Sequence, residues 1–123
     1  MKTFRRIRRD EKGFTLIEIM IVVLIIGILL AIAVPNFIRA RETSRAKSCI
    51  SNLKQIDAAK EQWAMDNKMT TGDTPTWPGD LVGLDSYIKK EPECPSGGVY
   101  SVNGVGTDPL CDAVVPAYAP HEL

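Results

Sequence analysis

The stretch Gly13-Phe14-Thr15-Leu16-Ile17-Glu18 lies between a basic leader and a long apolar segment, and it decides how the chain is organised. The 21 residues 14–34 contain a single charged residue, Glu18. About 20 apolar residues in a helix are needed to cross the hydrocarbon core of a bilayer. A carboxylate inside such a segment costs about 3 kcal/mol unless it finds a partner. Glu18 therefore predicts assembly with another chain, because a plain membrane anchor has no use for it.

The charge distribution changes sharply along the chain. Six cations precede the apolar segment: Lys2, Arg5, Arg6, Arg8, Arg9 and Lys12. Four more follow it: Arg39, Arg41, Arg45 and Lys47. Because basic flanks favour the cytoplasmic side, the larger group before the segment favours an N-terminus inside the cell.

The exported part of the chain is predicted to be acidic. The formal net charge of the 123 residues is zero, but loss of residues 1–13 removes six cations and two anions and leaves a net charge of −4. Bulk nucleic-acid binding relies on clustered lysine and arginine. No direct nucleic-acid binding is therefore expected.

The segment from Lys12 to Glu18 resembles the processing site of type IV prepilins and type II secretion pseudopilins, and the match continues through the apolar run to Pro35. The resemblance implies that a prepilin peptidase cuts between Gly13 and Phe14 and methylates the new amino group of Phe14. It implies that Glu18 is the carboxylate used in assembly. Pro35 cannot donate a helical hydrogen bond, so a kink or an unwound turn is expected there.

The same resemblance implies a structural subunit of a type IV pilus or a type II secretion pseudopilus, polymerised through its N-terminal helix. The implied partners are the peptidase/methyltransferase, identical or related pilin subunits in a helical filament, an inner-membrane assembly platform, and the lipid bilayer before assembly. The chain would be a single-pass inner (cytoplasmic) membrane protein with an exported C-terminal domain, and later part of an extracellular pilus or a periplasmic pseudopilus.

Four zones follow from these patterns. They are a cleaved leader (1–13), a transmembrane and assembly helix (14–34), an amphipathic continuation of that helix (35–67) and a small globular tail (68–123). In the third zone apolar residues recur at three- and four-residue steps, which predicts one buried stripe. The stripe consists of Cys49, Ile50, Leu53, Ile56 and Trp63. The expected fold class is α+β and pilin-like, with a long N-terminal helix packed on a small antiparallel β-sheet.

The tail contains clear turn signals. Asp80 is expected to cap a short helix that reaches Ile88. Asn103-Gly104 separates two apolar runs and is typical of a two-residue hairpin turn. The flanking strands are expected at 99–102 and 105–107, and residues 113–118 form a possible third strand.

Three cysteines, Cys49, Cys94 and Cys111, fit a domain in an oxidising compartment. Cys94 and Cys111 flank the expected hairpin, and a disulfide between them would stabilise the tail by about 3 kcal/mol. Cys49 is expected to be a free thiol on the buried stripe, and the alternative is a bridge from the helix to the tail. No Cys-x-x-Cys pair occurs and the single histidine, His121, lies near the C-terminus, so neither a metal site nor a cofactor is expected.

The sequence contains no pattern typical of an enzyme. One histidine near the terminus cannot build a catalytic triad. Several aspartates lie in the tail without the spacing of a calcium loop, so turns and caps explain them better. They are Asp73, Asp80, Asp85 and Asp108.

Two other functions compete with the filament subunit. One is a soluble exported domain released by signal peptidase after Ala33, because Ala31-Ile32-Ala33 has the small-x-small pattern of such sites. Glu18 within the apolar run and Pro35 just after the site oppose this alternative. The other is an anchored domain that never polymerises.

Overall fold

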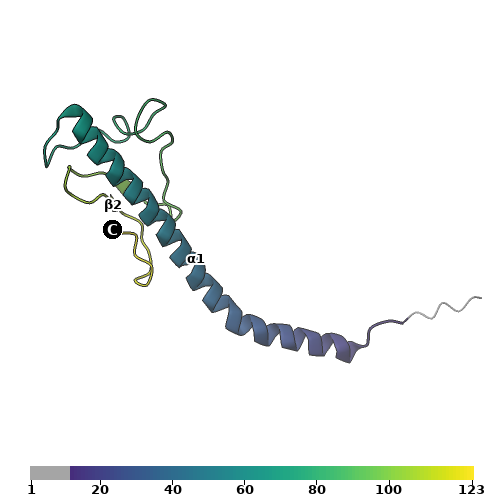
Figure 1. Ribbon diagram of the computed structural model, residues 1–123. Coiled ribbons are helices and arrows are strands. Elements are labelled where there is room, and N and C mark those ends of the chain that lie inside the picture. The colour runs from purple at the N-terminus through teal and green to yellow at the C-terminus, as the bar shows by residue number, and fades with distance from the viewer. Residues whose placement is uncertain (1–11) are drawn as a thin grey trace, which may run out of the picture. The chain divides into compact units, whose positions relative to one another are not determined.

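The computed structural model describes residues 12–123 and contains one helix, α1 (Leu16–Asn67), and two strands, β1 (Tyr100–Ser101) and β2 (Leu110–Cys111) (Figure 1). The predicted α+β, pilin-like class is confirmed. Most of the predicted leader, residues 1–11, lies outside the described residues. The chain divides into two compact units, one ending at Phe37 and the other covering Ile38–Leu123.

The predicted single helix to Asn67 is confirmed, because α1 continues without a break through Pro35. No unwound turn occurs at that proline, and a kink there stays a prediction. The helix ends where Lys68 takes a positive φ of 57° and the Met69 N–H donates to the Ala64 carbonyl over 2.8 Å. This arrangement is a Schellman motif, which satisfies the last helical carbonyls.

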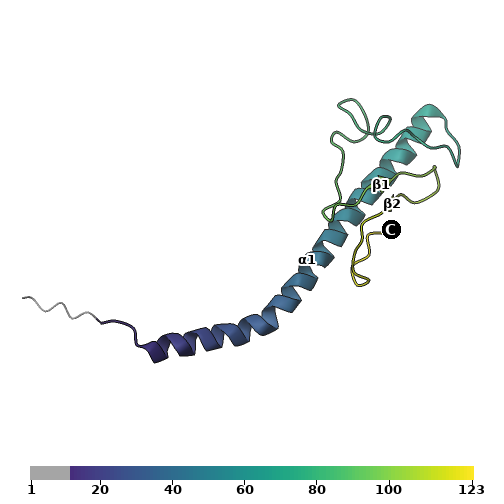
Figure 2. The same ribbon diagram turned by 180° about the vertical axis from the view of Figure 1, so that it is seen from behind.

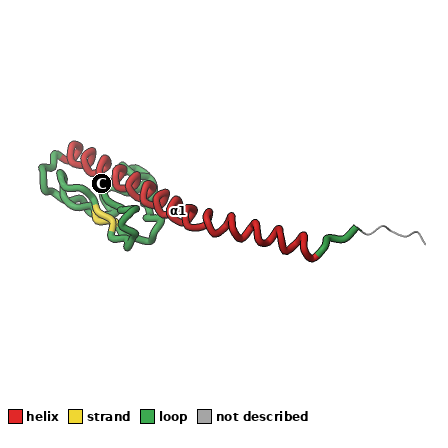
Figure 3. Tube along the Cα trace, turned by 90° about the horizontal axis from the view of Figure 1, so that it is seen from below, coloured by secondary structure: helices red, strands yellow, loops and turns green. Residues whose placement is uncertain are grey.

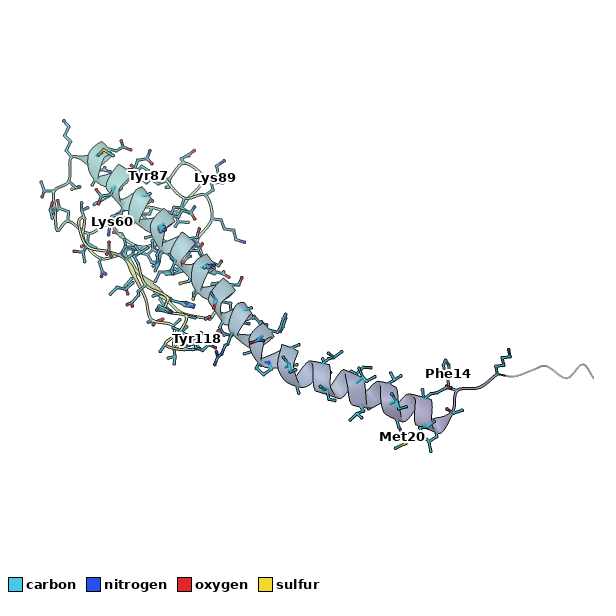
Figure 4. The ribbon with its side chains drawn as sticks, turned by 60° about the horizontal axis from the view of Figure 1, so that its bottom comes forward. Phe14, Met20, Lys60, Tyr87, Lys89 and Tyr118 are labelled. Carbon is cyan, nitrogen blue, oxygen red and sulfur yellow. The ribbon has the colours of Figure 1, made fainter. Side chains whose placement is uncertain are left out.

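In the first unit, the apolar side chains of α1 are exposed. Phe14 is 85% exposed and Leu30 is 52% exposed. Phe14 and Met20 project from their segment into open space (Figure 4). One stretch of α1 is long and apolar enough to cross a membrane, and none of it is buried within the protein.

In the second unit, the loops and the two strands run along one side of the second half of α1 (Figures 2 and 3). Cys49, Leu53 and Ile56 are completely buried there, packed with Leu81 and Ile88 from the segment after the helix. Of the predicted apolar stripe, these three helical residues form the core of this unit, Trp63 packs against it partly buried, and Ile50 is only partly buried and lies outside the cluster. The tail is too small to bury a core alone and uses the helix as one wall.

The predicted hairpin is wrong in its register. Tyr100 pairs with Cys111 and Ser101 pairs with Leu110, so the second strand begins after residue 107. Val105, expected in that strand, instead pairs with the segment after α1: its N–H donates to the Asp73 carbonyl over 2.8 Å and its carbonyl accepts from the Gly72 N–H over 2.9 Å. Because these contacts occupy the backbone of residue 105, the loop between the strands is longer than two residues.

The predicted short helix at 80–88 and the possible third strand at 113–118 are also absent from the described residues. Asp80 does not cap a helix. Its Oδ2 accepts from the Thr76 N–H over 2.7 Å and stabilises a turn. A single bridge between Val82 and Ile88 follows, in which the Gly83 N–H donates to the Ile88 carbonyl and the Ile88 N–H to the Leu81 carbonyl, each over 2.9 Å, so the segment closes as a local loop.

The side chain of Lys60 is completely buried, which is rare for a lysine. Its ammonium donates to the carbonyl of Val102 over 3.1 Å and to the carbonyl of Thr107, and Asp57 Oδ1 lies 3.5 Å away. Figure 4 shows Lys60 on the side of α1 that faces the tail. The buried charge thus holds the loop between the strands against the helix.

Candidate functional site: the N-terminal assembly segment

The first turn of α1 is closed by a reciprocal cap. The Thr15 N–H donates to Glu18 Oε2 over 3.2 Å, and the Glu18 N–H donates to Thr15 Oγ1 over 3.3 Å. This is a capping box, in which two otherwise unpaired helical N–H groups are satisfied by side chains. The Thr-x-x-Glu spacing is the sequence signature of a capping box. Thr15 is therefore a residue that the sequence analysis missed.

The cap uses the carboxylate of Glu18 as a hydrogen-bond acceptor but does not neutralise it. Among residues 12–123, no cation lies within ion-pair distance of Glu18. The negative charge also lies at the positive end of the helix dipole, which stabilises it modestly. The carboxylate is therefore positioned by the cap and is available to a charged partner.

The peptide between Gly13 and Phe14 lies just outside the helix. Residues 12–15 are non-helical and exposed. A Cβ added to Gly13 would meet no atom within 4 Å. The chain itself therefore does not require glycine at this position.

The second unit brings together four side chains that the sequence keeps far apart. We call them the cysteine–histidine cluster: Cys49, Cys94, Cys111 and His121. Their ligand atoms, three sulfurs and one ring nitrogen, all lie within 4.8 Å of one another. The sequence spacing did not fit a metal site, and it cannot show that the C-terminal segment folds back onto α1 and brings His121 to the cysteines.

All three cysteines are free thiols in the structure, so the expected bridge between Cys94 and Cys111 is not formed. The bridge stays a prediction, and Cys49 occupies the buried position that was expected for it. The cluster also places Cys49 beside the other two sulfurs, as the alternative of a bridge from the helix to the tail would require.

The environments of the three sulfurs differ. Burial raises the pKa of the Cys49 thiol to about 12, and a hydrogen bond from the Tyr100 hydroxyl opposes part of the rise. Burial also acts to raise the pKa of Cys94, but backbone N–H groups of Ser96 and Gly98 and the neighbouring thiols lower it below its ordinary value. Burial raises the pKa of Cys111.

Two aspartates of the tail, Asp73 and Asp80, stabilise turns through their carboxylates. Asp73 Oδ2 accepts from the Thr70 N–H over 2.7 Å, much as Asp80 does from Thr76. These bonds confirm the expected turn chemistry at both positions.

A fully exposed apolar helix with a capped carboxylate at its start and a small α+β domain on its second half defines a class of protein: the pilin-type filament subunit. Residues 8–34 match the family model described as the prokaryotic N-terminal methylation motif. The chain is 36% identical to competence protein ComGC of Bacillus subtilis over 97 residues, covering 77% of this chain and 92% of that protein. No solved structure gives a significant match.

Two further relatives come from other systems. The type II secretion system core protein G of Klebsiella michiganensis is 29% identical over 114 residues, covering 80% of this chain and 78% of that protein. The type IV major pilin protein PilA of Myxococcus xanthus is 48% identical over 58 residues, covering 47% of this chain and 26% of that protein. The chain belongs to the type IV pilin and type II secretion pseudopilin family and is a structural subunit of a pilus or pseudopilus.

Proposed function

We propose that the chain is cut between Gly13 and Phe14 by a prepilin peptidase, is methylated on Phe14, and polymerises through its N-terminal helix with Glu18 as the assembly carboxylate. The observation that carries the proposal is the exposed, apolar first half of α1 with one capped carboxylate at its start. The chain has no catalytic role in this scheme.

The accessibility of the backbone supports the cleavage site. A peptidase needs an extended substrate, and Gly13–Phe14 is non-helical. The alternative site after Ala33 lies inside α1, where every backbone group is held by the helix. Release of a soluble domain at Ala33 would also leave the amphipathic half of α1 without its apolar start. The relatives do not favour that alternative.

The exposed apolar surface of the first half of α1 must be covered, and this supports polymerisation. Side chains that are half or more exposed on every side of a helix need lipid or other apolar helices around them. The bilayer supplies this before assembly, and identical or related subunits supply it in a filament. The protein is membrane-anchored and exported. We assign it first to the inner membrane, where an assembly platform would take it up.

Charge complementarity supports the role of Glu18. Cleavage creates a positive amino group at Phe14, and a neighbouring subunit's Glu18 is its natural partner. Removing one partner of a buried ion pair costs about 3–5 kcal/mol, so a slip in axial register is strongly disfavoured. The pair thus sets how far each subunit rises along the filament.

The three relatives belong, by their names, to a competence system, a secretion system and a pilus. What the three systems share is a filament subunit, and the proposal assigns this chain that role without choosing one of the systems. The test is mass spectrometry of the mature N-terminus together with recovery of sheared filaments. Methylated Phe14 and sheared filaments support the proposal, whereas an N-terminus at Val34 contradicts it.

A further inference from the structure

The cysteine–histidine cluster gathers four ligand atoms from four segments. Cys49 comes from α1, Cys94 from the loop before β1, Cys111 from β2 and His121 from the C-terminal tail. Cys49 is completely buried, and Cys94 and His121 are 8% and 4% exposed. Figure 2 shows β2 and the C-terminus next to each other beside α1, which agrees with this grouping.

The spacing suits one metal ion at the centre. Zinc bonds of about 2.3 Å to sulfur and about 2.0–2.1 Å to nitrogen, in a tetrahedron, separate the ligand atoms by about 3.5–3.8 Å. Cys94 Sγ lies 3.4 Å from His121 Nδ1, and the whole set lies within 4.8 Å. A disulfide would unite two sulfurs at about 2.05 Å and give neither the third cysteine nor the histidine a role.

His121 gives an independent reason to expect a ligand. A histidine near a chain terminus normally stays in solvent, but this one is buried, and its Nε2 has no hydrogen-bond partner within residues 12–123. A buried polar atom without a partner calls for an explanation such as an ion or a water molecule. A cation bound at Nδ1, which lies 3.4 Å from Cys94 Sγ, offsets part of the cost of burying the ring and leaves Nε2 to bond a water molecule.

The backbone around the cluster lets Cys94 and Cys111 approach one another. The segment Cys94-Pro95-Ser96-Gly97-Gly98 forms a turn, in which the Gly97 N–H donates to the Cys94 carbonyl over 3.0 Å. A Cβ on Gly98 would lie 2.6 Å from Cys111 Sγ, so glycine there lets the two cysteine loops meet.

A second layer of contacts orients the ligands. The Tyr100 hydroxyl, whose residue packs in the same core as Cys49, accepts from Asn52 Nδ2 over 3.0 Å. The same amide donates to the carbonyl of Glu93, next to Cys94, over 3.0 Å. Such outer contacts fix the ligands of metal sites and tune their affinity. Asn52 is therefore a positioning residue that links the helical ligand to the loop ligand.

We propose that the cysteine–histidine cluster binds one Zn²⁺ ion in a closed tetrahedral site that is structural. Three cysteines and one histidine are a common ligand set for structural zinc, with no open position for a substrate. Thiolate and imidazole ligands favour zinc over calcium or magnesium. Binding releases the thiol protons to solvent, and three thiolates with one neutral imidazole around Zn²⁺ leave a single net negative charge.

The ion explains how so small a tail keeps its fold. The described part of the tail has only two strands of two residues each. Domains of this size commonly need a disulfide or a metal ion in addition to their core. Zinc binding free energy becomes folding free energy when the ligands come from separate segments, as they do here.

The test uses the full chain, purified in detergent without added reductant. We expect about one zinc per chain by elemental analysis, and three labelled thiols after denaturation with a chelator. Replacement by Co²⁺ should give the thiolate-to-metal charge-transfer bands and the strong visible bands of tetrahedral cobalt. A peptide map with Cys94 linked to Cys111 and one free thiol, or three free thiols with no uptake of zinc, would overturn the proposal.

His121→Ala separates the metal site from a disulfide, because a disulfide does not need the imidazole. This variant should lower zinc affinity by at least about tenfold, since even outer contacts carry an effect of that size. Its matched control is Glu122→Ala, an exposed neighbour in the same tail, which should bind like the parent. Equal affinity of His121→Ala and the parent would contradict the assignment.

The role of Asn52 has its own readout. Asn52→Ala should keep one metal per chain but weaken its affinity by about 10–100-fold. The control is Ser51→Ala, which changes an exposed residue on the same helix. If Asn52→Ala binds zinc as tightly as the parent, Asn52 is not a positioning residue.

Discussion

Thr15 and Glu18 cap the first turn of α1 together, each donating its backbone N–H to the side chain of the other over 3.2–3.3 Å. Glu18 therefore has two separable properties. Its oxygen atoms cap the helix, and its negative charge is free to pair with another subunit. An alanine at position 18 would remove both, so it cannot say which one assembly needs.

Glu18→Gln isolates the charge, because glutamine also completes a capping box. We expect this variant to be produced, inserted and cleaved, and its exported domain to fold normally. The yield of sheared filaments should fall at least about tenfold, because the Phe14 amino group of a neighbour loses its partner in a buried setting. Filament recovery, normalised to the subunit level in the membrane fraction, measures this.

Thr15→Ala is the complementary control. It removes the hydroxyl half of the cap and costs about 1 kcal/mol of helix stability, but it leaves the charge of Glu18. Filaments should form at a level close to that of the parent. If Thr15→Ala abolishes filaments while Glu18→Gln assembles well, the cap and not the charge controls assembly.

Gly13→Val should block cleavage and leave membrane insertion intact. A Cβ at this position would meet no atom within 4 Å, so a loss of cleavage would arise in the peptidase, where the backbone must come close to the catalytic carboxylates. An immunoblot that separates precursor from mature protein reports the result. Cleavage of Gly13→Val at the parental rate would refute the assigned site.

Lys60→Met should destabilise the exported domain by about 3 kcal/mol. Methionine has a similar volume, but it leaves the buried carbonyls of Val102 and Thr107 without their donor, and such unsatisfied groups are costly. Urea unfolding of the full chain in micelles, followed by tryptophan fluorescence, measures the change. Lys54→Ala, exposed on the same helix, should stay within about 0.5 kcal/mol of the parent.

Gly98→Ala should disrupt the packing around Cys111. The added methyl would lie 2.6 Å from the Cys111 sulfur and 2.7 Å from the Ala113 Cβ, so the loops must separate. We expect a loss of about 1–3 kcal/mol, the usual cost of overpacking, together with weaker metal retention. Gly79→Ala is the control, since its methyl would make an ordinary 3.5 Å contact with Thr76. Equal unfolding midpoints for the two variants would contradict the close approach.

Local signals in the sequence were sufficient for the helix and its apolar stripe. Periodicity reports which face of a helix is buried, and Cys49, Leu53 and Ile56 are buried as predicted. The N-terminal segment could be predicted equally well, because a run of apolar residues with one carboxylate indicates a membrane-spanning assembly helix without any tertiary contact. The same segment contains the Thr-x-x-Glu signature of the helix cap, which the sequence analysis missed.

Tertiary structure alone decided the tail. The Asn103-Gly104 turn signal was outweighed because residue 105 pairs with residues 72 and 73, far away in the sequence. The buried ammonium of Lys60 became favourable only once two loop carbonyls were brought to it. His121 reaches the three cysteines because the C-terminus folds back against α1. Such contacts depend on how distant segments pack, and no local propensity encodes them.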